Sequence, residues 1–206
     1  DELIVLAGRP SMGKSSFALN LLRAVAVDGG RPAVMFTLEM SAENIVQNLL
    51  CALGRVDAQR MRKLTLSEEE RSHLVRASDM LHQAPLWIDD TPAISLTELR
   101  GKTRRLKTRH DIQLCIVDYM QLMMASTQAQ RRSREQEISE ISRGLKALAK
   151  ELQIPVIALS QLNRKPEGRT DNRPILSDLR ESGAIEQDAD VVFLLHRPDY
   201  YNKDES

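Results

Sequence analysis

Eight residues near the start of the chain have the types and spacing of a phosphate-binding loop. Residues 8–15 read Gly-Arg-Pro-Ser-Met-Gly-Lys-Ser, which matches the pattern G-x-x-x-x-G-K-S. The backbone N–H groups of such a loop bind phosphate oxygens at the start of a helix. Lys14 would then bind the β- and γ-phosphates of a nucleotide, and the Ser15 hydroxyl would bind Mg²⁺. The residues predicted to bind nucleotide in this loop are Gly8, Pro10, Ser11, Met12, Gly13, Lys14, Ser15 and Ser16.

The segments on either side of the loop support this interpretation. An apolar run at residues 3–7 precedes it and is typical of a buried strand. A helix-period segment at residues 16–27 follows it. Strand, glycine-rich loop and helix distinguish a phosphate loop from an ordinary glycine turn before a helix, which is the alternative. The predicted apolar face of the helix consists of Phe17, Leu21, Leu22 and Val25.

A later apolar run ends in the carboxylate that a nucleotide site with Mg²⁺ needs. Residues 112–117 are predicted to form a strand, and Asp118 follows directly. An acid at a strand end is often only a turn residue. Together with the phosphate loop, however, Asp118 is predicted to contribute to the nucleotide site and to hold Mg²⁺, directly or through water. Tyr119 follows instead of a second acid, so the residue that activates water must come from elsewhere.

Two more polar residues follow predicted strands. Glu39 is the candidate for polarising the attacking water; the alternative is an acid that favours the dipole of the next helix. The Gln161 amide can donate to the γ-phosphate or to water; the alternative is a hydrogen-bonded strand terminus. The carboxyl ends of parallel strands meet at one edge of a sheet, where ligands bind. Gly8, Glu39, Asp118 and Gln161 are therefore predicted to share one site.

Strand-like runs alternate with helix-period segments throughout the chain. The predicted strands are 3–7, 33–38, 85–90, 112–117, 155–159 and 190–195. The predicted helices are 16–27, 41–53, 67–81, 95–107, 133–152 and a short one from 177 that Gly183 ends. Ser67 and Ser95 open capping-box patterns. The alternation predicts an α/β fold with a mainly parallel twisted sheet between two helical layers, in one domain over residues 1–206. Two polar segments, 125–134 and 163–173, are predicted loops.

Composition and charge argue against several classes of protein. Lys and Arg total 29, as do Asp and Glu, so the chain lacks the basic excess of a free-standing DNA-binding module, although local contacts in a ring or filament remain compatible. No apolar run reaches the roughly 18–20 residues of a membrane span. Cys51 and Cys115 lie in apolar segments, as buried thiols in a reducing, cytoplasmic compartment do. The four histidines lack ligand spacing, so no zinc is predicted.

Two basic features each allow two interpretations. The predicted helix 95–107 is rich in Lys and Arg; we favour a solvated face over a subunit contact. Arg180 in the Arg-Glu-Ser-Gly segment at 180–183 can contact a phosphate, and Gly183 permits close approach to a strand; an exposed loop with salt bridges is the alternative. Aromatic residues make up 3% of the chain, so contacts with a nucleic acid would favour the backbone over base stacking.

Five motifs together closely resemble one known family, the C-terminal motor domain of the replicative DnaB-type helicases. The resemblance covers essentially the whole chain and is carried by residues 8–15, 37–40, 116–122, 158–164 and 177–190, the last of which reads Ser-Asp-Leu-Arg-Glu-Ser-Gly-Ala-Ile-Glu-Gln-Asp-Ala-Asp. Thr37 and Met120 stand where the family often has Ser and Leu. The resemblance implies a RecA-like P-loop NTPase fold, a homohexameric ring and ATP-driven 5′ to 3′ translocation on single-stranded DNA. Primase and a helicase loader are the implied partners.

The resemblance also implies roles for individual residues. Lys14 and Ser15 would bind ATP and Mg²⁺, Glu39 would be the catalytic base, Asp118 the Walker-B acid and Gln161 the sensor of nucleotide state. The implied contacts with the DNA backbone are Arg180, Glu181 and Gly183. The family's N-terminal domain, linker helix and arginine-finger strand are expected outside these 206 residues.

Two rival functions fit the same fold. A recombinase would form filaments and exchange strands, and the motif around Arg180 and Gly183 argues against it. A nucleotide-gated assembly protein would bind ATP without acting as a motor. The presence of both Glu39 and Asp118 argues against that alternative, since a protein that only binds nucleotide needs no catalytic base.

Overall fold

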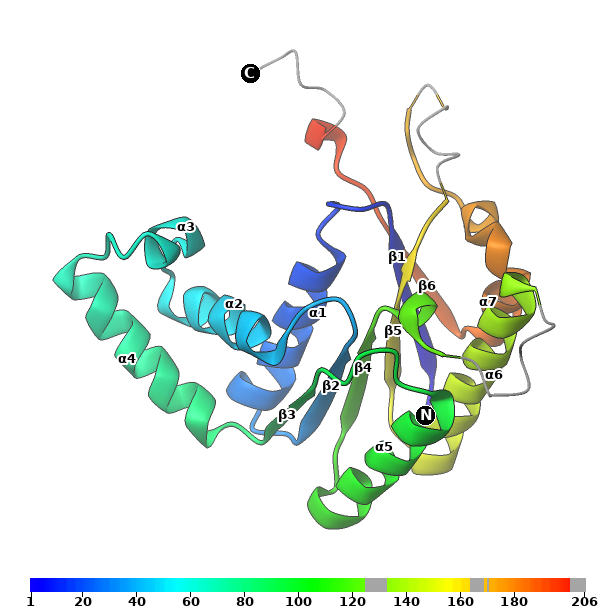
Figure 1. Cartoon of the computed structure of the whole chain (residues 1–206), viewed down its shortest axis with the longest axis horizontal. Coiled ribbons are helices and arrows are strands. Elements are labelled where there is room, and N and C mark those ends of the chain that lie inside the picture. The colour runs from blue at the N-terminus through cyan, green and yellow to red at the C-terminus, as the bar shows by residue number, and fades with distance from the viewer. Residues whose placement is uncertain (125–132, 164–168, 170, 201–206) are drawn as a thin grey trace.

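The computed structural model describes residues 1–124, 133–163, 169 and 171–200, and for residues 180–184 it describes the backbone only. Strands and helices alternate along the chain, as predicted (Figure 1). The strands are β1 (Leu3–Gly8), β2 (Ala33–Thr37), β3 (Leu86–Asp89), β4 (Leu114–Asp118), β5 (Val156–Gln161) and β6 (Val191–Leu195). The α-helices are α1 (Lys14–Arg23), α2 (Ala42–Gly54), α3 (Ala58–Arg62), α4 (Glu68–Gln83), α5 (Leu96–His110), α6 (Arg134–Leu152) and α7 (Gly183–Asp188).

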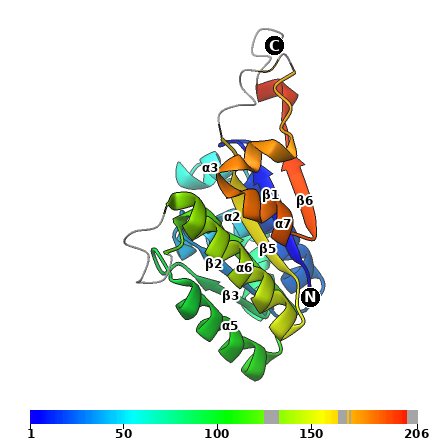
Figure 2. The same ribbon diagram turned by 90° about the vertical axis from the view of Figure 1, so that its right-hand side faces the viewer.

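The strands form one six-stranded sheet in the order β3-β2-β4-β5-β1-β6. Every strand pair in the described part of the chain runs parallel, so all the carboxyl ends lie at one edge. Helices α1 to α4 lie on one side of the sheet and α5 to α7 on the other (Figures 1 and 2). The predicted α/β sandwich of three layers is confirmed.

Alternating side chains of each strand build two separate cores. In β2, Val34 and Phe36 face the layer of α5 and α6, whereas Ala33 and Met35 face α1 and α2. All four side chains are at most 1% exposed. Both faces are buried because helices cover both, which explains why the strands are apolar runs without polar alternation. These two cores fix the strand ends from which the site is built.

Most predicted helix starts are confirmed by their caps. Ser41 accepts a hydrogen bond from the Asn44 backbone N–H, and Ser67 and Ser133 form complete capping boxes. At Ser95 the predicted box is only half present. Its hydroxyl accepts from the backbone N–H of Glu98, but the Glu98 carboxylate pairs with Lys102 at 3.3 Å instead of returning to the cap.

Two further predictions about the helices are wrong, and one helix was not predicted. Phe17 is 41% exposed, and the buried side chains of α1 are those of Ala18, Leu19 and Leu22. Gly183 does not end a helix: a 3₁₀ turn covers Leu176–Ser182, and α7 starts at Gly183. Helix α3 was not predicted; it begins after Asp57, whose side chain caps it.

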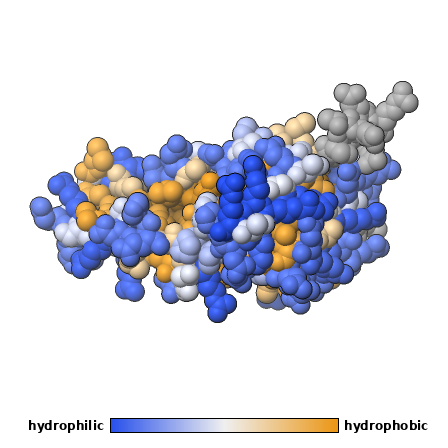
Figure 3. Space-filling model, turned by 90° about the horizontal axis from the view of Figure 1, so that it is seen from below, coloured by the Kyte–Doolittle hydropathy of each residue, from blue (hydrophilic) through white to orange (hydrophobic). Residues whose placement is uncertain are grey.

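Part of the apolar surface lies on the side of the molecule where α2 and α4 are found (Figure 3). A shallow groove of about 340 Å³ between these helices and β3 includes Val46, Leu50, Leu81 and Ile88. No helix in the described part of the chain combines the length and the hydropathy needed to cross a membrane. Cys51 and Cys115 are both unpaired and buried, as predicted.

Candidate nucleotide-binding site

The phosphate loop connects the end of β1 to the start of α1. Gly13 caps α1 with a φ of 91°, a left-handed conformation that favours glycine. The Nζ atom of Lys14 turns back over the loop and donates to the carbonyl oxygens of Gly8 and Arg9 at 3.0 and 3.1 Å. Burial lowers the pKa of Lys14, and the neighbouring carboxylates of Asp118 and Glu39 oppose that shift. A lysine held at a helix N-terminus in this way is suited to binding phosphate.

Two of the four predicted strand-end residues, Glu39 and Gln161, line one cavity of about 390 Å³. It joins six residues of the loop to Glu39 beyond β2 and to Gln161 at the end of β5. The lining residues are Pro10, Ser11, Gly13, Lys14, Ser15, Ser16, Glu39, Tyr119, Gln161 and Arg197. Three residues of the predicted set, Gly8, Met12 and Asp118, are not among them. The Met12 side chain is only 4% exposed and packs inward. The Gly8 carbonyl accepts a hydrogen bond from Lys14.

Asp118 lies beneath this cavity at the end of β4 and is 1% exposed. Neither carboxylate oxygen has a hydrogen-bond partner of ordinary geometry in the described part of the chain. Burial raises the pKa of Asp118; the nearby Ser15 hydroxyl lowers it, Glu39 raises it further and Lys14 lowers it. A buried carboxylate without a partner is costly unless a ligand compensates it.

The donor set around Asp118 fits Mg²⁺. Mg²⁺ prefers oxygen ligands, and it usually binds one or two protein oxygens together with phosphates and waters. The Ser15 hydroxyl and the Asp118 carboxylate provide such a pair of oxygens. The described residues contain no group of three or more His, Cys, Asp or Glu side chains that would form an all-protein metal cage. Two protein oxygens suit a metal whose other ligands are phosphates and waters.

Glu39 is positioned by a tight turn after β2. The buried hydroxyl of Thr37 donates to the Met40 carbonyl at 2.9 Å and accepts from the Met40 N–H at 3.2 Å. The Leu38 N–H donates to the Asp118 carbonyl at 2.7 Å, which ties this turn to the end of β4. Thr37 thus holds the turn that presents the exposed Glu39 carboxylate to the cavity, a positioning role that the sequence reasoning missed.

Arg197 and Tyr119 also line the cavity, and sequence reasoning assigned neither to it. Arg197 comes two residues after β6, whose last residue, Leu195, pairs with Gly8. A Cβ atom at Gly8 would lie 3.3 Å from the Leu195 Cβ, so β6 approaches the start of the loop closely. The signal in the sequence was a basic residue after the sixth strand. It becomes informative only once β6 is known to lie beside β1.

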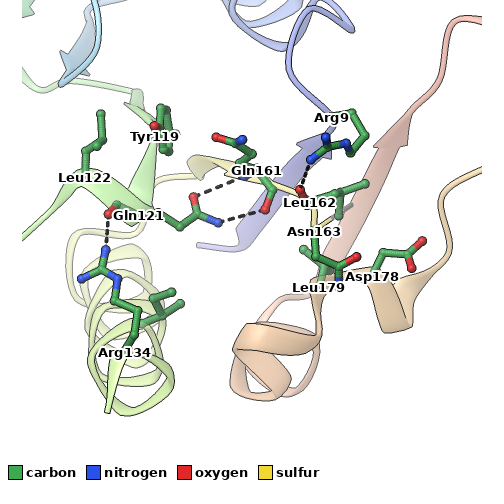
Figure 4. A pocket seen from close by; sticks show the side chains of 11 residues that line it. Arg9, Tyr119, Gln121, Leu122, Arg134, Gln161, Leu162, Asn163, Asp178 and Leu179 are labelled. Carbon is green, nitrogen blue, oxygen red and sulfur yellow. Dashed lines mark hydrogen bonds between the residues drawn. The ribbon is translucent and has the colours of Figure 1, made fainter. Parts of the chain in front are cut away.

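A second cavity of about 610 Å³ adjoins the first at the same edge of the sheet (Figure 4). Tyr119 and Gln161 line both cavities and form the wall between them. Arg9 of the phosphate loop donates to the Leu162 carbonyl at 2.9 Å. The chain next to Gln161 is thus held by a hydrogen bond from the phosphate loop.

The residues predicted to contact DNA follow Leu179, which lines the second cavity. Arg180 and Glu181 belong to the 3₁₀ turn η5 (Leu176–Ser182), and Gly183 begins α7. Their side chains are outside the described part of the structure, so these contacts stay predictions. Most of the predicted loop 125–134 (residues 125–132) and of the loop 163–173 (164–168 and 170) also lies outside the described residues, as does the chain after residue 200.

The basic helix α5 makes ion pairs within the chain. Arg104 donates to Glu151 of α6 from Nε and from one Nη nitrogen, and Arg100 binds the same carboxylate at 3.0 Å. Lys102 binds Asp89 at 2.8 Å, and Lys107 binds Asp111 at 2.7 Å. Intramolecular pairing therefore accounts for much of the positive charge that the sequence placed on this helix.

Comparison with known proteins now identifies the family. The family described as "DnaB-like helicase C terminal domain" matches residues 1–206, the whole chain. The chain belongs to this family. The resemblance carried by the five motifs is therefore confirmed, and the DnaB-like assignment covers every described element of the fold and site.

Two curated DnaB-like relatives show how far the similarity extends. The chain is 50% identical over 203 residues to the replicative DNA helicase DnaB of Geobacillus stearothermophilus, covering 98% of the chain and 44% of that protein. It is 48% identical over 204 residues to the replicative DNA helicase DnaC of Bacillus subtilis, covering 99% and 45%. The chain thus spans a little under half the length of these relatives.

Solved structures agree with the fold. One solved ATPase domain superposes with a TM-score of 0.93 at 36% identity, covering all of this chain and 72% of that one. A DnaB-like replicative helicase studied with its interactions with primase gives a TM-score of 0.93 at 37% identity, covering 100% and 49%. A KaiC-like protein of Pyrococcus horikoshii, at 18% identity and a TM-score of 0.58, shares the fold alone. The RecA-like assignment is confirmed.

Proposed function

We propose that this chain is the ATP-hydrolysing motor domain of a replicative DNA helicase. The observation that carries the proposal is the cavity in which Lys14 and Ser15 meet Glu39 and Gln161, close to the buried Asp118 carboxylate, which has no hydrogen bond of ordinary geometry in the described chain. Both curated relatives described above are named replicative DNA helicases. A site built only to bind a nucleotide would not need a carboxylate at the position of Glu39.

Each residue has a distinct part in the proposed reaction. The Lys14 ammonium and the loop N–H groups bind the β- and γ-phosphates and stabilise the negative charge on the transferred phosphoryl group. Glu39 orients a water molecule in line with the γ-phosphorus and accepts its proton. The Gln161 amide donates to the γ-phosphate oxygens or to the attacking water, so its position depends on the nucleotide. Ser15 and Asp118 would hold Mg²⁺, which would offset the negative charge of the nucleotide phosphates.

The proposed active form is a homohexameric ring in the cytoplasm around single-stranded DNA. The nucleotide would lie between subunits, and an arginine from a neighbour would complete the site in trans. Arg180, Glu181 and Gly183 would contact the DNA backbone, and repeated cycles of hydrolysis would move the ring 5′ to 3′. Primase is a proposed partner, because one DnaB-like structure was studied for its interactions with primase. A helicase loader is the other proposed partner.

Unwinding of a forked DNA substrate by the full-length protein tests the proposal. Wild-type protein with ATP and Mg²⁺ should separate the strands, and Lys14→Ala should remove both unwinding and phosphate release. Lys150→Ala, an exposed lysine on α6, is the matched control and should unwind normally. ATP-dependent strand pairing without unwinding would favour the recombinase alternative. ATP-dependent oligomerisation without turnover would favour the non-motor assembly protein.

A further inference from the structure

The carboxamide of Gln121 binds the backbone of Gln161 at the wall between the two cavities. Gln121 lies in the 3₁₀ turn η2 (Met120–Leu122), three residues after Asp118. Its Nε2 donates to the Gln161 carbonyl at 3.2 Å, and its Oε1 accepts from the Gln161 N–H at 3.3 Å (Figure 4). Nε2 also donates to the buried hydroxyl of Ser160 at 2.8 Å. One side chain thus makes three hydrogen bonds to the end of β5.

These bonds take the place of pairing with β4, which does not extend to the end of β5. The ladder between β4 and β5 ends where Val117 pairs with Ala158. A carboxamide carries the same donor and acceptor as a peptide group, so the Gln121 side chain extends the pairing to Gln161. On its other side Gln161 is in register with Gly8 of β1. The last residue of β5 is therefore held from both sides, although its side chain faces the nucleotide cavity.

The same residue is linked to the start of α6. The backbone carbonyl of Gln121 accepts a hydrogen bond from the Arg134 guanidinium, and Arg134 is the first residue of α6. The same guanidinium pairs with Glu137 at 2.5 Å, one turn along the helix. A displacement of Gln161 would therefore be transmitted through Gln121 to the N-terminus of α6, and the reverse also holds.

We propose that Gln121 is a positioning residue that sets the place of Gln161 in the nucleotide site and couples it, through Arg134, to α6. The inference rests on the proposed function and assigns a part of the motor to a residue outside the nucleotide cavity. Gln121 does not line that cavity, so it acts on the reaction only through Gln161. Glutamine is required chemically: a glutamate lacks the N–H donor, and an asparagine is one methylene too short to keep all three bonds.

The first measurement is steady-state ATP hydrolysis by the full-length protein. Gln121→Ala should lower kcat roughly tenfold, because small displacements of catalytic groups cost this much or more, and should leave KM for ATP within about threefold. Gln113→Ala is the matched control: it removes an intermediate-exposure glutamine that comes just before β4, whereas Gln121 comes just after it. A Gln121→Ala enzyme with wild-type kcat overturns the proposal, as does a loss confined to KM.

Gln121→Glu gives a second readout that a merely structural role would not produce. The carboxylate retains an acceptor for the Gln161 N–H but repels the Gln161 carbonyl, whereas the protonated carboxyl group donates to it. Partial burial raises the pKa of the introduced carboxyl group, whereas the guanidinium groups of Arg9 and Arg134, which line the same cavity, lower it. The kcat of this variant relative to wild type should therefore rise as the pH is lowered from about 8 to about 5. A kcat ratio that does not rise as the pH is lowered overturns the proposal.

Arg134→Ala tests the link to α6. It should leave hydrolysis without DNA within about twofold of wild type and lower the stimulation by single-stranded DNA roughly threefold or more; Arg143→Ala, an exposed arginine on the same helix, should change neither. Unchanged stimulation in Arg134→Ala rejects the coupling. Lys14→Ala distinguishes failure of the Gln121 inference from failure of the proposed function. If Lys14→Ala is inactive and Gln121→Ala is normal, only this inference fails; if Lys14→Ala hydrolyses ATP like wild type, the proposed function fails.

Discussion

Two regions of this molecule contain clusters of charged side chains. They differ in whether the central carboxylate has hydrogen-bond partners within the chain. On the α5–α6 surface, Glu151 accepts hydrogen bonds from both Arg104 and Arg100, which lower its pKa to about 2. At the carboxyl edge of the sheet, Asp118 is buried without a partner of ordinary geometry in the described chain, and burial raises its pKa. The first carboxylate has its partners within the chain; for the second, we propose that a ligand supplies them.

We infer from this difference that the Glu151 network has a structural role and that Asp118 has a functional one. Glu151 and its arginines are partly exposed, so their pairing contributes little to stability and needs no other molecule. Asp118 and Lys14 lie close enough to shift each other's pKa, yet Lys14 donates to loop carbonyls instead of forming a direct ion pair. A buried charge kept in this state costs stability in the unliganded protein, and such costs are typical of catalytic sites. The following predictions test this contrast, from the largest expected effect to the smallest.

Glu39→Gln should cause the largest loss. Without the carboxylate, the attacking water is not deprotonated, so kcat for ATP hydrolysis should fall about 10²–10⁴-fold while nucleotide binding persists. Phosphate release and binding of a fluorescent ATP analogue measure the two effects in parallel. Glu43→Gln, an exposed acid in the first turn of α2, is the control. Normal turnover in Glu39→Gln would remove Glu39 as the base.

Asp118→Asn should abolish Mg²⁺-dependent turnover and at the same time stabilise the unliganded protein. Removing an uncompensated buried charge should raise the free energy of unfolding by about 1–3 kcal/mol. That gain corresponds to a Tm increase of about 2–4 °C per kcal/mol for a domain of this size. Thermal unfolding without nucleotide or Mg²⁺ is the measurement.

The pH dependence of that gain has a definite sign. Because the folded-state pKa of Asp118 is raised, the destabilising charge is present above that pKa and disappears as the pH falls toward the ordinary value of 3.8. The Tm difference between Asp118→Asn and wild type should therefore be largest near neutral pH and shrink in acid. A variant less stable than wild type at neutral pH would contradict the view that Asp118 is left unsatisfied for a ligand.

Arg197→Ala should weaken nucleotide binding more than catalysis. Arg197 approaches the phosphate loop from β6, on the side of β1 away from Asp118 and Gln161. Loss of one charge-assisted hydrogen bond should raise KM for ATP about tenfold and change kcat less than about threefold. Arg76→Ala, exposed on α4, serves as the control in the same kinetic assay. A loss confined to kcat would place Arg197 at the γ-phosphate instead.

Glu151→Gln should have the smallest effect. It breaks a partly exposed network, so Tm should fall by only about 1–3 °C at neutral pH, and ATP turnover should not change. Because the pKa of Glu151 is lowered from 4.5 to about 2, its contribution is present above pH 4.5 and is lost as the pH falls through that interval. The Tm difference between Glu151→Gln and wild type should therefore shrink in acid. An altered kcat would show that the α5–α6 network reaches the site.

Local patterns in the sequence were sufficient for much of the fold and site. The phosphate loop, the strand ending in Asp118 and the helix caps at Ser41, Ser67 and Ser133 depend on residues within a few positions of one another. Periodicity and spacing therefore reveal them. They were not sufficient for α1, because apolar residues lie on more than one of its faces. Packing against the sheet selected Ala18 and Leu22 and left Phe17 exposed.

The amino-acid sequence by itself determined which residues end strands and which chemistry they carry. Only the tertiary structure decided their neighbours. The strand order places β6 beside β1, which brings Arg197 to the phosphate loop, and it places the Gln121 amide against Gln161, 40 residues away. It also pairs Arg104 with Glu151, 47 residues away, while Asp118 keeps no such partner in the described chain. Such contacts depend on how whole elements pack, and no local periodicity encodes them.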